Sequence, residues 1–402
     1  MEALGENGRS SLTIVQGQND GSQPSSIDEH TSFETRKPFT TLSAIGTGYG
    51  ATNTAVGLLL VLGSTVPMGG SPLFFWGFLL MIFVAWATAT SLAELASAMP
   101  HPGGQYIWVN QLAPTSTRRA LSYCTAISSW LGAVATGASA CLSASTGICA
   151  IIRFLNPAFV YRRWMGFVAF QVLNLITLFC SCFERALPHI SRAVLFVSVT
   201  SAAVVFLALQ LEWVARRNCF PDGHKRNNWS LSCLDVVTHL AEEIPSPSTN
   251  IPKALMWSVV VGFISGALVI TSVFVNVPAI NAADDNSALV LFYRISGSKA
   301  IAVGIWIPIL IATVGALWSI QIWQSRLSWT ISRERGFPLY RYLSRIAPAP
   351  FYTPVWSLVW SAAFTAAFGC LYLGSELAFN SIISTGLLLH SGMALFGILG
   401  WD

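Results

Sequence analysis

Charged side chains are scarce in this 402-residue sequence. Asp, Glu, Lys and Arg make up 10% of it and apolar residues 53%, whereas an ordinary soluble domain carries about 25% charged residues. The scarcity is also local, because no charged residue occurs from Pro38 to Ala93. A fold in water could not cover so long an uncharged stretch, so the composition excludes a soluble globular protein.

Motifs of nucleotide-driven pumps and metalloenzymes are missing as well. The chain has no GxxxxGK[ST] loop and no HExxH pattern, and His239-x-x-Glu242 lacks a second histidine. The eight cysteines stand at positions 124, 141, 149, 180, 182, 219, 233 and 370. They lack C-x-x-C spacing, and most lie in apolar stretches, where Cys acts as a small apolar residue. The sequence therefore favours a protein without enzymatic activity, metal or cofactor.

Long uncharged stretches recur along the rest of the chain. A helix of roughly 20 apolar residues crosses a bilayer core of about 30 Å, and the alternation at period two that marks a membrane barrel is absent. The predicted spans cover about 39–62, 72–93, 120–152, 164–183, 193–211, 229–244 (partial), 254–279, 300–325, 353–375 and 377–400, with a turn at 63–72. The fold class is thus an all-α polytopic membrane protein whose solvent is the lipid bilayer.

The distribution of Lys and Arg predicts the orientation of these spans. Residues 1–37 are rich in Ser, Gly, Gln and acidic groups and are expected to form a disordered cytosolic tail, ahead of a transmembrane domain at 38–402. With this tail inside, the first alternate segments hold Arg9, Arg36, Lys37, Arg118, Arg119, Arg185 and Arg192 inside and Arg153, Arg162 and Arg163 outside. Lys and Arg favour the cytoplasmic side, so the N-terminus and the arginine-rich loop 326–352 are both expected there. We interpret the basic and aromatic stretch 326–345 as a loop on anionic lipid and not as a nucleic-acid site.

Three glycines interrupt the first predicted span. Gly46, Gly48 and Gly50 alternate in it, and each lowers helix propensity by about 1 kcal/mol. An unwound stretch at membrane depth is tolerated where its free backbone groups line a cavity or meet a ligand. We therefore interpret Gly46–Gly50, with Asn53, as part of a binding site. Close helix packing through Gly46-x-x-x-Gly50 is the alternative.

The second irregular place is the sixth segment, 229–244. It is short for a span and carries Asp235 and His239 ahead of Glu242 and Glu243. Ionisable groups at membrane depth are costly and often functional, so Asp235 is a candidate site residue. We interpret the two glutamates as a hydrated cytoplasmic helix end.

Several motifs resemble those of one transporter family. Residues 91–100 (SLAELASAMP) and 102–109 (PGGQYIWV) look like the second-helix signature of the amino acid–polyamine–organocation superfamily. Residues 239–255 (HLAEEIPSPSTNIPKAL) are similar to the segment between helices six and seven in its fungal amino acid, GABA and choline permease branch. Residues 46–55 (GTGYGATNTA) and 69–77 (GGSPLFFWG) most resemble choline-transporter-like members.

The resemblance implies an inverted repeat of five plus five helices, with substrate between broken helices one and six. Two departures stand out. The chain stops after the tenth predicted helix where family members have twelve, and residues 216–228 (RRNCFPDGHKRNN) replace the apolar first half of helix six. We therefore expect a bundle that is truncated and has a defective sixth helix.

The expected function is secondary transport of a small organic amine across the plasma membrane, with choline as the first candidate. Tyr49 and Trp130 would supply aromatic faces for a quaternary ammonium, and Asp235 the counter-charge. If the substrate is instead an amino acid or GABA, free N–H groups at Gly46–Gly50 would bind its carboxylate. A coupled proton would need Asp235 or Glu94. A transport-dead relic of such a permease is the remaining alternative.

The Lys and Arg count predicts a labelling pattern. In intact cells, single cysteines placed before Pro38 or in 326–352 should be protected from an impermeant maleimide, and those in 279–297 should react, because the first two regions are expected inside. Reaction of 326–352 from outside would show that 229–244 is no crossing.

Overall fold

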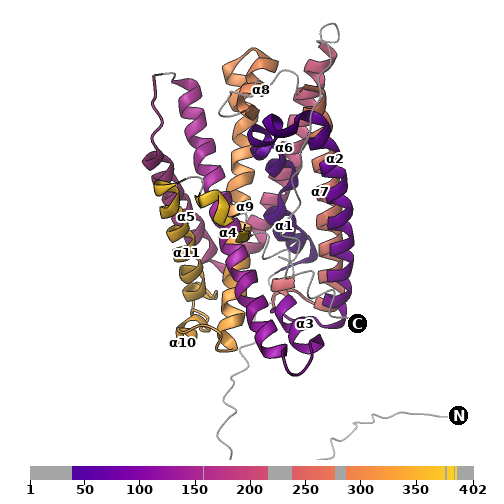
Figure 1. Ribbon diagram of the computed structural model, residues 1–402, viewed down its shortest axis with the longest axis vertical. Coiled ribbons are helices and arrows are strands. Elements are labelled where there is room, and N and C mark those ends of the chain that lie inside the picture. The colour runs from indigo at the N-terminus through magenta and orange to yellow at the C-terminus, as the bar shows by residue number, and fades with distance from the viewer. Residues whose placement is uncertain are drawn as a thin grey trace, which may run out of the picture. The chain divides into compact units, whose positions relative to one another are not determined.

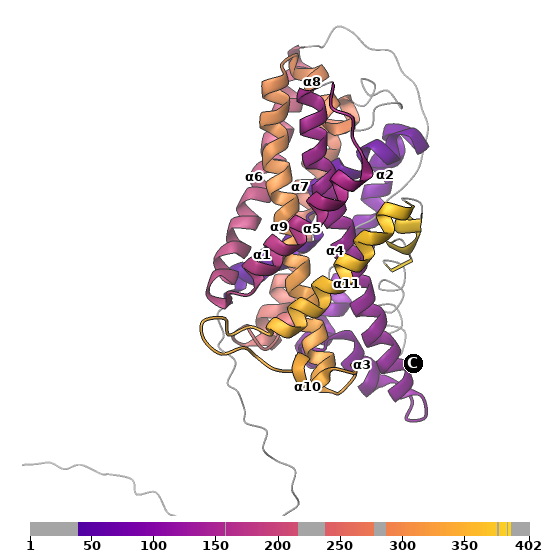
Figure 2. The ribbon, with the colours of Figure 1, turned by 90° about the vertical axis from the view of Figure 1, so that its left-hand side faces the viewer.

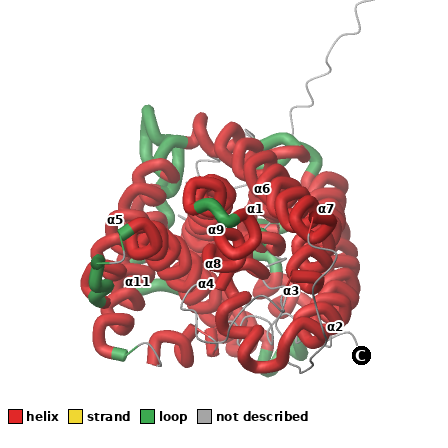
Figure 3. The backbone as a smooth tube through the Cα atoms, turned by 90° about the horizontal axis from the view of Figure 1, so that it is seen from above, coloured by secondary structure: helices red, strands yellow, loops and turns green. Residues whose placement is uncertain are grey.

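The computed structural model describes residues 39–156, 158–215, 238–276, 287–375, 378–383 and 385–386. This part of the chain contains no β-strand (Figure 3). It contains short helical stretches at 238–240 and 378–383 and a series of further helices (Figures 1 and 2). The further helices are α1 Thr41–Thr52, α2 Thr54–Ala98, α3 Gln105–Leu112, α4 Arg118–Leu155, α5 Arg163–Ser181, η1 Glu184–Ala186, α6 Leu187–Ala215, α7 Pro247–Asn276, α8 Ser287–Ser296, α9 Lys299–Arg333, α10 Tyr340–Leu343 and α11 Val355–Gly374. The all-helical prediction is confirmed for the described residues.

Seven helical stretches in the described residues are long and apolar enough to cross a membrane. They are Phe75–Ala98, Arg118–Leu155, Arg163–Ser181, Glu184–Gln210, Pro247–Val273, Lys299–Arg333 and Val355–Gly374. Each overlaps one predicted span. The predicted tail 1–37, the stretch 216–228 and most of the predicted segments 229–244 and 377–400 lie outside the described residues.

Helix α2 must reverse direction within its own length. In a straight helix, residues 54 and 78 would lie about 36 Å apart at 1.5 Å per residue. Both nevertheless meet the same glycine of α7, because a Cβ added to Gly266 would lie 3.0 Å from Thr54 Cγ2 and 2.6 Å from Phe78 Cε2. The reversal therefore falls around the predicted turn 63–72. Its backbone stays helical, and its Gly and Pro residues allow a helix to bend sharply.

Helix α9 is the central element of the described fold. Its side chains take part in all five clusters of buried apolar residues. Helices α1, α2, α6 and α7 pack on one another, as do α4, α5 and α11, and both groups pack on α9. Seen from above, α9 lies between α5 and α11 on one side and α1, α6 and α7 on the other (Figure 3).

The second half of α9 buries polar side chains as well as apolar ones. The buried polar side chains are Ser319, Gln321, Gln324, Ser325, Arg326, Ser328, Thr330 and Ser332. Gln324 donates to Ala133 O in α4 at 2.9 Å. The hydroxyl groups that donate to carbonyl oxygens about one turn earlier in α9 are those of Ser325, Ser328, Thr330 and Ser332. Such bonds satisfy groups that would be costly to bury alone. Since α9 continues as helix to Arg333, the prediction of a loop from residue 326 onward is wrong for its first eight residues.

Candidate functional site

The first transmembrane segment is interrupted at one residue. Helix α1 ends at Thr52, α2 begins at Thr54, and Asn53 between them has a left-handed backbone with a φ of 33°. Asn adopts this conformation more readily than most residues, because its short polar side chain bonds locally. The first span is therefore interrupted, but three residues after Gly50 and not at the glycines where the sequence predicted it.

Two helix ends meet inside the protein at this point. The last carbonyls of α1 and the first N–H groups of α2 have no partner within their own helices, and they carry partial negative and positive charge respectively. Asn53 N donates to Tyr49 O at 2.7 Å, and the Thr52 hydroxyl donates to the same oxygen at 3.1 Å. Asn53 and Thr54 are 3% and 6% exposed, so the interruption is enclosed by protein.

The side chains at the interruption are only partly satisfied. Asn53 Nδ2 donates to Ala312 O in α9 at 3.0 Å. Asn53 Oδ1 and Thr54 Oγ1 are buried and have no hydrogen-bond partner among the described residues. A buried polar group without a partner is uncommon in proteins. Two polar atoms at the break, which α7 and α9 flank, are therefore left without a hydrogen-bond partner in the described part of the chain.

The three glycines of α1 lie in regular helix, so the prediction of an unwound stretch at Gly46–Gly50 is wrong. A Cβ added to Gly46 would lie 2.5 Å from Ser191 O in α6, and one on Gly50 would lie 2.6 Å from Ser319 Oγ in α9. Gly48 is buried too. Gly46 and Gly50 thus let α1 approach its neighbours closely, as the packing alternative proposed.

Tyr49 is fully buried and links α1 to α7 through a side-chain hydrogen bond. Its hydroxyl donates to Ser265 Oγ at 2.8 Å. Two residues earlier, the hydroxyl groups of Thr47 and Ser191 lie 2.8 Å apart and join α1 to α6. The part of α1 before the break is therefore tied to both of these helices by side-chain hydrogen bonds.

Trp130 lies in an aromatic cluster with Phe337, Trp360 and Phe364. Its ring packs against Phe337 and Phe364, each with ring centroids 5.0 Å away, and stacks on Trp360 at 6.4 Å. Its Nε1 donates to Ser361 Oγ at 3.2 Å. In the described part of the chain Trp130 and Tyr49 have different partners, so a shared role in substrate binding stays a prediction.

The candidate acidic residues have different outcomes. Asp235 lies outside the described residues. Residues 238–243 form i→i+3 turns, with Ala241 N donating to Thr238 O and Glu243 N to Leu240 O, so this end of the predicted sixth segment is not a spanning α-helix. Glu94 is exposed near the end of α2, as expected for a helix-end residue.

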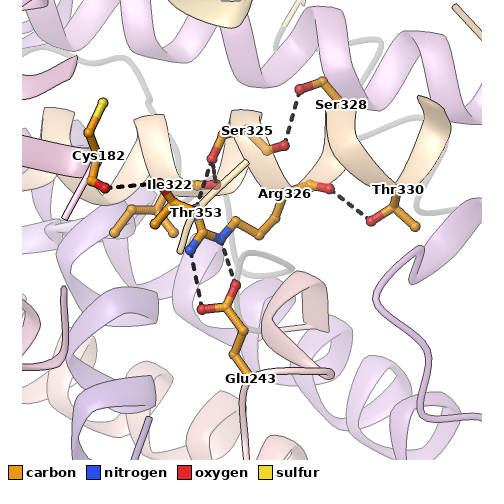
Figure 4. Close-up of polar contacts among 8 residues, drawn as sticks. All are labelled: Cys182, Glu243, Ile322, Ser325, Arg326, Ser328, Thr330 and Thr353. Carbon is orange, nitrogen blue, oxygen red and sulfur yellow. Dashed lines mark hydrogen bonds and ion pairs between the residues drawn. The ribbon is translucent and has the colours of Figure 1, made fainter. Parts of the chain in front are cut away.

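A buried ion pair joins this segment to α9. Arg326 Nε donates to Glu243 Oε1 at 2.7 Å and its Nη2 to Oε2 at 3.2 Å, which makes a two-pronged contact (Figure 4). The side chains are 3% and 13% exposed. The interpretation of Glu243 as a hydrated helix end is therefore wrong. Glu242, which pairs with Arg333 at 2.6 Å, is more exposed.

The pair holds three chain segments at one point. The Glu243 carboxylate forms the ion pair with Arg326 of α9. The Glu243 backbone oxygen accepts a hydrogen bond at 3.3 Å from the backbone N–H of Phe39, which lies just before α1. Next to it, His239 Nδ1 lies 3.0 Å from Pro102 O, and the Tyr106 hydroxyl donates to Glu334 Oε1 at 3.1 Å. Sequence reasoning missed this site because its partners are 83 residues apart.

Comparison with known proteins gives a consistent picture. Residues 39–400 match the family described as Amino acid permease. The chain is 57% identical to a transmembrane transporter, swnT, of Metarhizium robertsii over 90% of this chain and 78% of that protein. It is 56% identical to a swainsonine transporter, swnT, of Arthroderma benhamiae, over 90% of this chain and 76% of that one. A choline transporter of Saccharomyces cerevisiae is 31% identical over 87% and 66%.

A solved structure shares the fold. A Na⁺-coupled sialic acid symporter in a substrate-bound, outward-open state superposes with a TM-score of 0.55, at 12% sequence identity. The similarity covers 92% of this chain and 82% of that one. At this identity the likeness concerns the fold alone, and it agrees with the predicted broken-helix transporter bundle.

The close approach of α1 to α6 predicts the effect of adding one methyl group. Gly46→Ala should destabilise the protein by about 1–3 kcal/mol, because backbone atoms of α6 must move away. Gly57→Ala is the matched control, since a Cβ there would have no neighbour within 4 Å. The free energy of unfolding in mixed detergent micelles measures both. Equal stability of the two variants would show that α1 does not pack on α6 as described.

The buried ion pair predicts a strongly coupled double-mutant cycle. Glu243→Ala should destabilise the protein by about 3–5 kcal/mol, because it leaves the Arg326 charge buried without its partner. Adding Arg326→Leu to that variant should recover most of the loss. Glu242→Ala, at the more exposed pair, should cost at most about 1 kcal/mol. Unfolding free energies that are additive for Glu243 and Arg326 would contradict the pairing.

Proposed function

The chain belongs to the amino acid permease family, and we propose that it carries a small organic solute by alternating access, with swainsonine as the substrate. The observation that carries the proposal is the enclosed helix interruption at Asn53, whose carboxamide oxygen has no partner among the described residues. Interrupted helices in transporters expose backbone dipoles and polar groups to a substrate near the bilayer midplane.

The two relatives above 50% identity support swainsonine over choline. One is named a swainsonine transporter and the other carries the same designation, swnT, whereas the choline transporter is 31% identical. Choline, the candidate from the sequence, needs aromatic faces for its quaternary ammonium. Trp130 has its ring against three aromatic neighbours, which weakens that candidate. GABA and amino acids remain further alternatives.

The hydrogen-bonding chemistry at the break also bears on the substrate. A trimethylammonium group has no N–H to donate, so only the hydroxyl of choline could satisfy Asn53 Oδ1 or Thr54 Oγ1. A solute with several O–H or N–H donors would satisfy both. Leaving a buried acceptor unpaired costs about 1–3 kcal/mol, which is enough to discriminate between the two kinds of solute.

The contacts around the break suggest how access could alternate. Helices α1 and α7 are linked through Tyr49 and Ser265, and Glu243 holds the segment before α7 against α9. If the segment before α7 moved away from α9, Glu243 would separate from Arg326 and water could reach the break at Asn53. A coupled proton, a cytoplasmic N-terminus and a plasma-membrane location are further parts of the proposal.

Transport can be tested with the full 402-residue chain in proteoliposomes. Uptake of labelled swainsonine should saturate, and unlabelled swainsonine should compete better than choline or GABA. Asn53→Gly keeps the left-handed backbone but removes the carboxamide, so KM should rise roughly 2- to 12-fold for the loss of about 0.5–1.5 kcal/mol. Gly57→Ala should leave KM unchanged.

Each outcome separates the alternatives. Better competition by choline would make choline the substrate and leave the proposed binding position standing. Saturable uptake with the same KM for Asn53→Gly would move the site away from the break. Correct insertion in the bilayer without saturable uptake of any of these solutes would support the transport-dead relic.

A further inference from the structure

The segment between α9 and α11 presents a cluster of arginines and aromatic rings. Arg335, Arg341 and Arg345 are exposed, and we call them, with Tyr340 and Tyr342, the arginine face. Residues 335–356 contain no Asp or Glu. Glu334, the acidic residue just before this stretch in the sequence, accepts a hydrogen bond from the Tyr106 hydroxyl at 3.1 Å. The positive charge of the face is therefore not neutralised within its own segment.

This segment is anchored on the helices that flank it. Trp329 Nε1 of α9 donates to Ser344 O at 3.0 Å, and Ser357 Oγ of α11 donates to Leu343 O at 2.8 Å. Phe337 and Leu343 are buried beneath the segment, at 7% and 3% exposed. The arginine face is therefore a fixed surface that does not have to be ordered when a ligand binds.

Aromatic rings hold the guanidinium groups. Arg335 and Arg341 each lie 5.9 Å from the centre of the Tyr340 ring, and Arg345 lies 5.5 Å from that of Tyr342. Arginine stacked on a ring keeps its N–H groups free to bind oxygen atoms at the edge of the guanidinium plane. Such N–H pairs match the oxygens of a phosphate group.

The local potential is positive at this surface. Arg341 Nε donates to the Tyr340 hydroxyl oxygen at 3.4 Å. This hydrogen bond, the Arg341 charge and the smaller effect of the Arg335 charge lower the pKa of Tyr340 from its ordinary value of 10.0. An anion placed on the face would reduce the effect, so Tyr340 can report binding.

The surroundings place the face beside the membrane surface. It lies between the ends of two helices that are long and apolar enough to span a bilayer, α9 and α11. Leu339, Tyr342 and Trp356 are 47%, 55% and 55% exposed, and the last two rings are in edge contact with centroids 6.4 Å apart. Exposed aromatic residues at helix ends are typical of the headgroup region.

We propose that the arginine face binds the phosphate groups of anionic phospholipids in the membrane that surrounds the protein. Its charge complements an anionic headgroup, its exposed rings lie at headgroup depth, and its backbone is already fixed. Clusters of basic residues next to a spanning helix bind anionic lipid in this way.

The test uses the full chain in nanodiscs of phosphatidylcholine with 30% phosphatidylserine. After transfer to mild detergent, native mass spectrometry should find phosphatidylserine retained in preference to phosphatidylcholine. In the triple variant Arg335→Gln/Arg341→Gln/Arg345→Gln, the ratio of retained phosphatidylserine to retained phosphatidylcholine should fall at least 10-fold. The control Arg162→Gln/Arg163→Gln/Lys299→Gln removes three exposed charges and should keep it.

The control residues lie at the opposite end of the spans. Tyr106 of α3 contacts Glu334 at the end of α9, and α4 begins at Arg118 shortly after α3. The start of α4 is therefore on the same side as the end of α9. The end of α4 and the starts of α5 and α9 are therefore on the other side. Equal loss of phosphatidylserine from both triple variants would reduce the effect to general charge and overturn the proposal.

A second measurement does not depend on retained lipid. Absorbance titration of the wild type minus Tyr340→Phe isolates the Tyr340 phenol, whose pKa should rise when phosphatidylserine replaces phosphatidylcholine. No rise would contradict binding at this face. Residues 1–37 hold Glu2, Glu6, Asp20, Asp28, Glu29 and Glu34. If lipid were retained only after these were changed to Gln or Asn, the face would belong to the chain's own tail, and the proposal would be wrong.

Discussion

The absence of water inside a bilayer is the constraint on which this structure depends. Each backbone N–H and C=O at that depth needs a partner within the protein, so the chain crosses as helices and can interrupt one of them only where other helices enclose the break. Asn53 meets this condition because α7 and α9 flank it and Ala312 O receives its amide. The same constraint turns the polar side chains of α9 inward, where hydroxyl groups and amides find carbonyl oxygens.

The helices could be predicted from the sequence because the cost of burying charge acts residue by residue. Seven predicted spans coincide with described helices that could cross a membrane, and α2 reverses around the turn predicted at 63–72. The end of the ninth helix was misjudged for the same reason. Arg326 was taken to mark water, whereas a carboxylate distant in sequence allows it to stay buried. Hydropathy assigns each residue a free-energy cost of burial that does not depend on the residues it contacts in the fold.

The site was only partly predictable because packing and ligand binding both favour small residues. Gly46 and Gly50 indicated the correct segment, but they allow close contact of α1 with α6 and α9. The break falls at Asn53 instead, because the short polar side chain of Asn makes a left-handed backbone less costly. Trp130 was an equally reasonable candidate until its neighbours were known, since a cation and another aromatic ring both bind its faces. Tertiary contacts decide between such roles.

An ion pair suits the point where α9 meets the segment before α7. Burying Glu243 and Arg326 costs hydration that their attraction only partly returns, so the net stability of such a pair is small. If the two segments separate, water replaces the lost partner on each side and most of the cost is recovered. An apolar contact of the same area would instead lose free energy with every Å² exposed, by about 25 cal/mol. A buried pair can therefore fix the positions of the two segments in the closed arrangement while adding little to its stability. A protein that alternates between two states needs such a small free-energy difference between them.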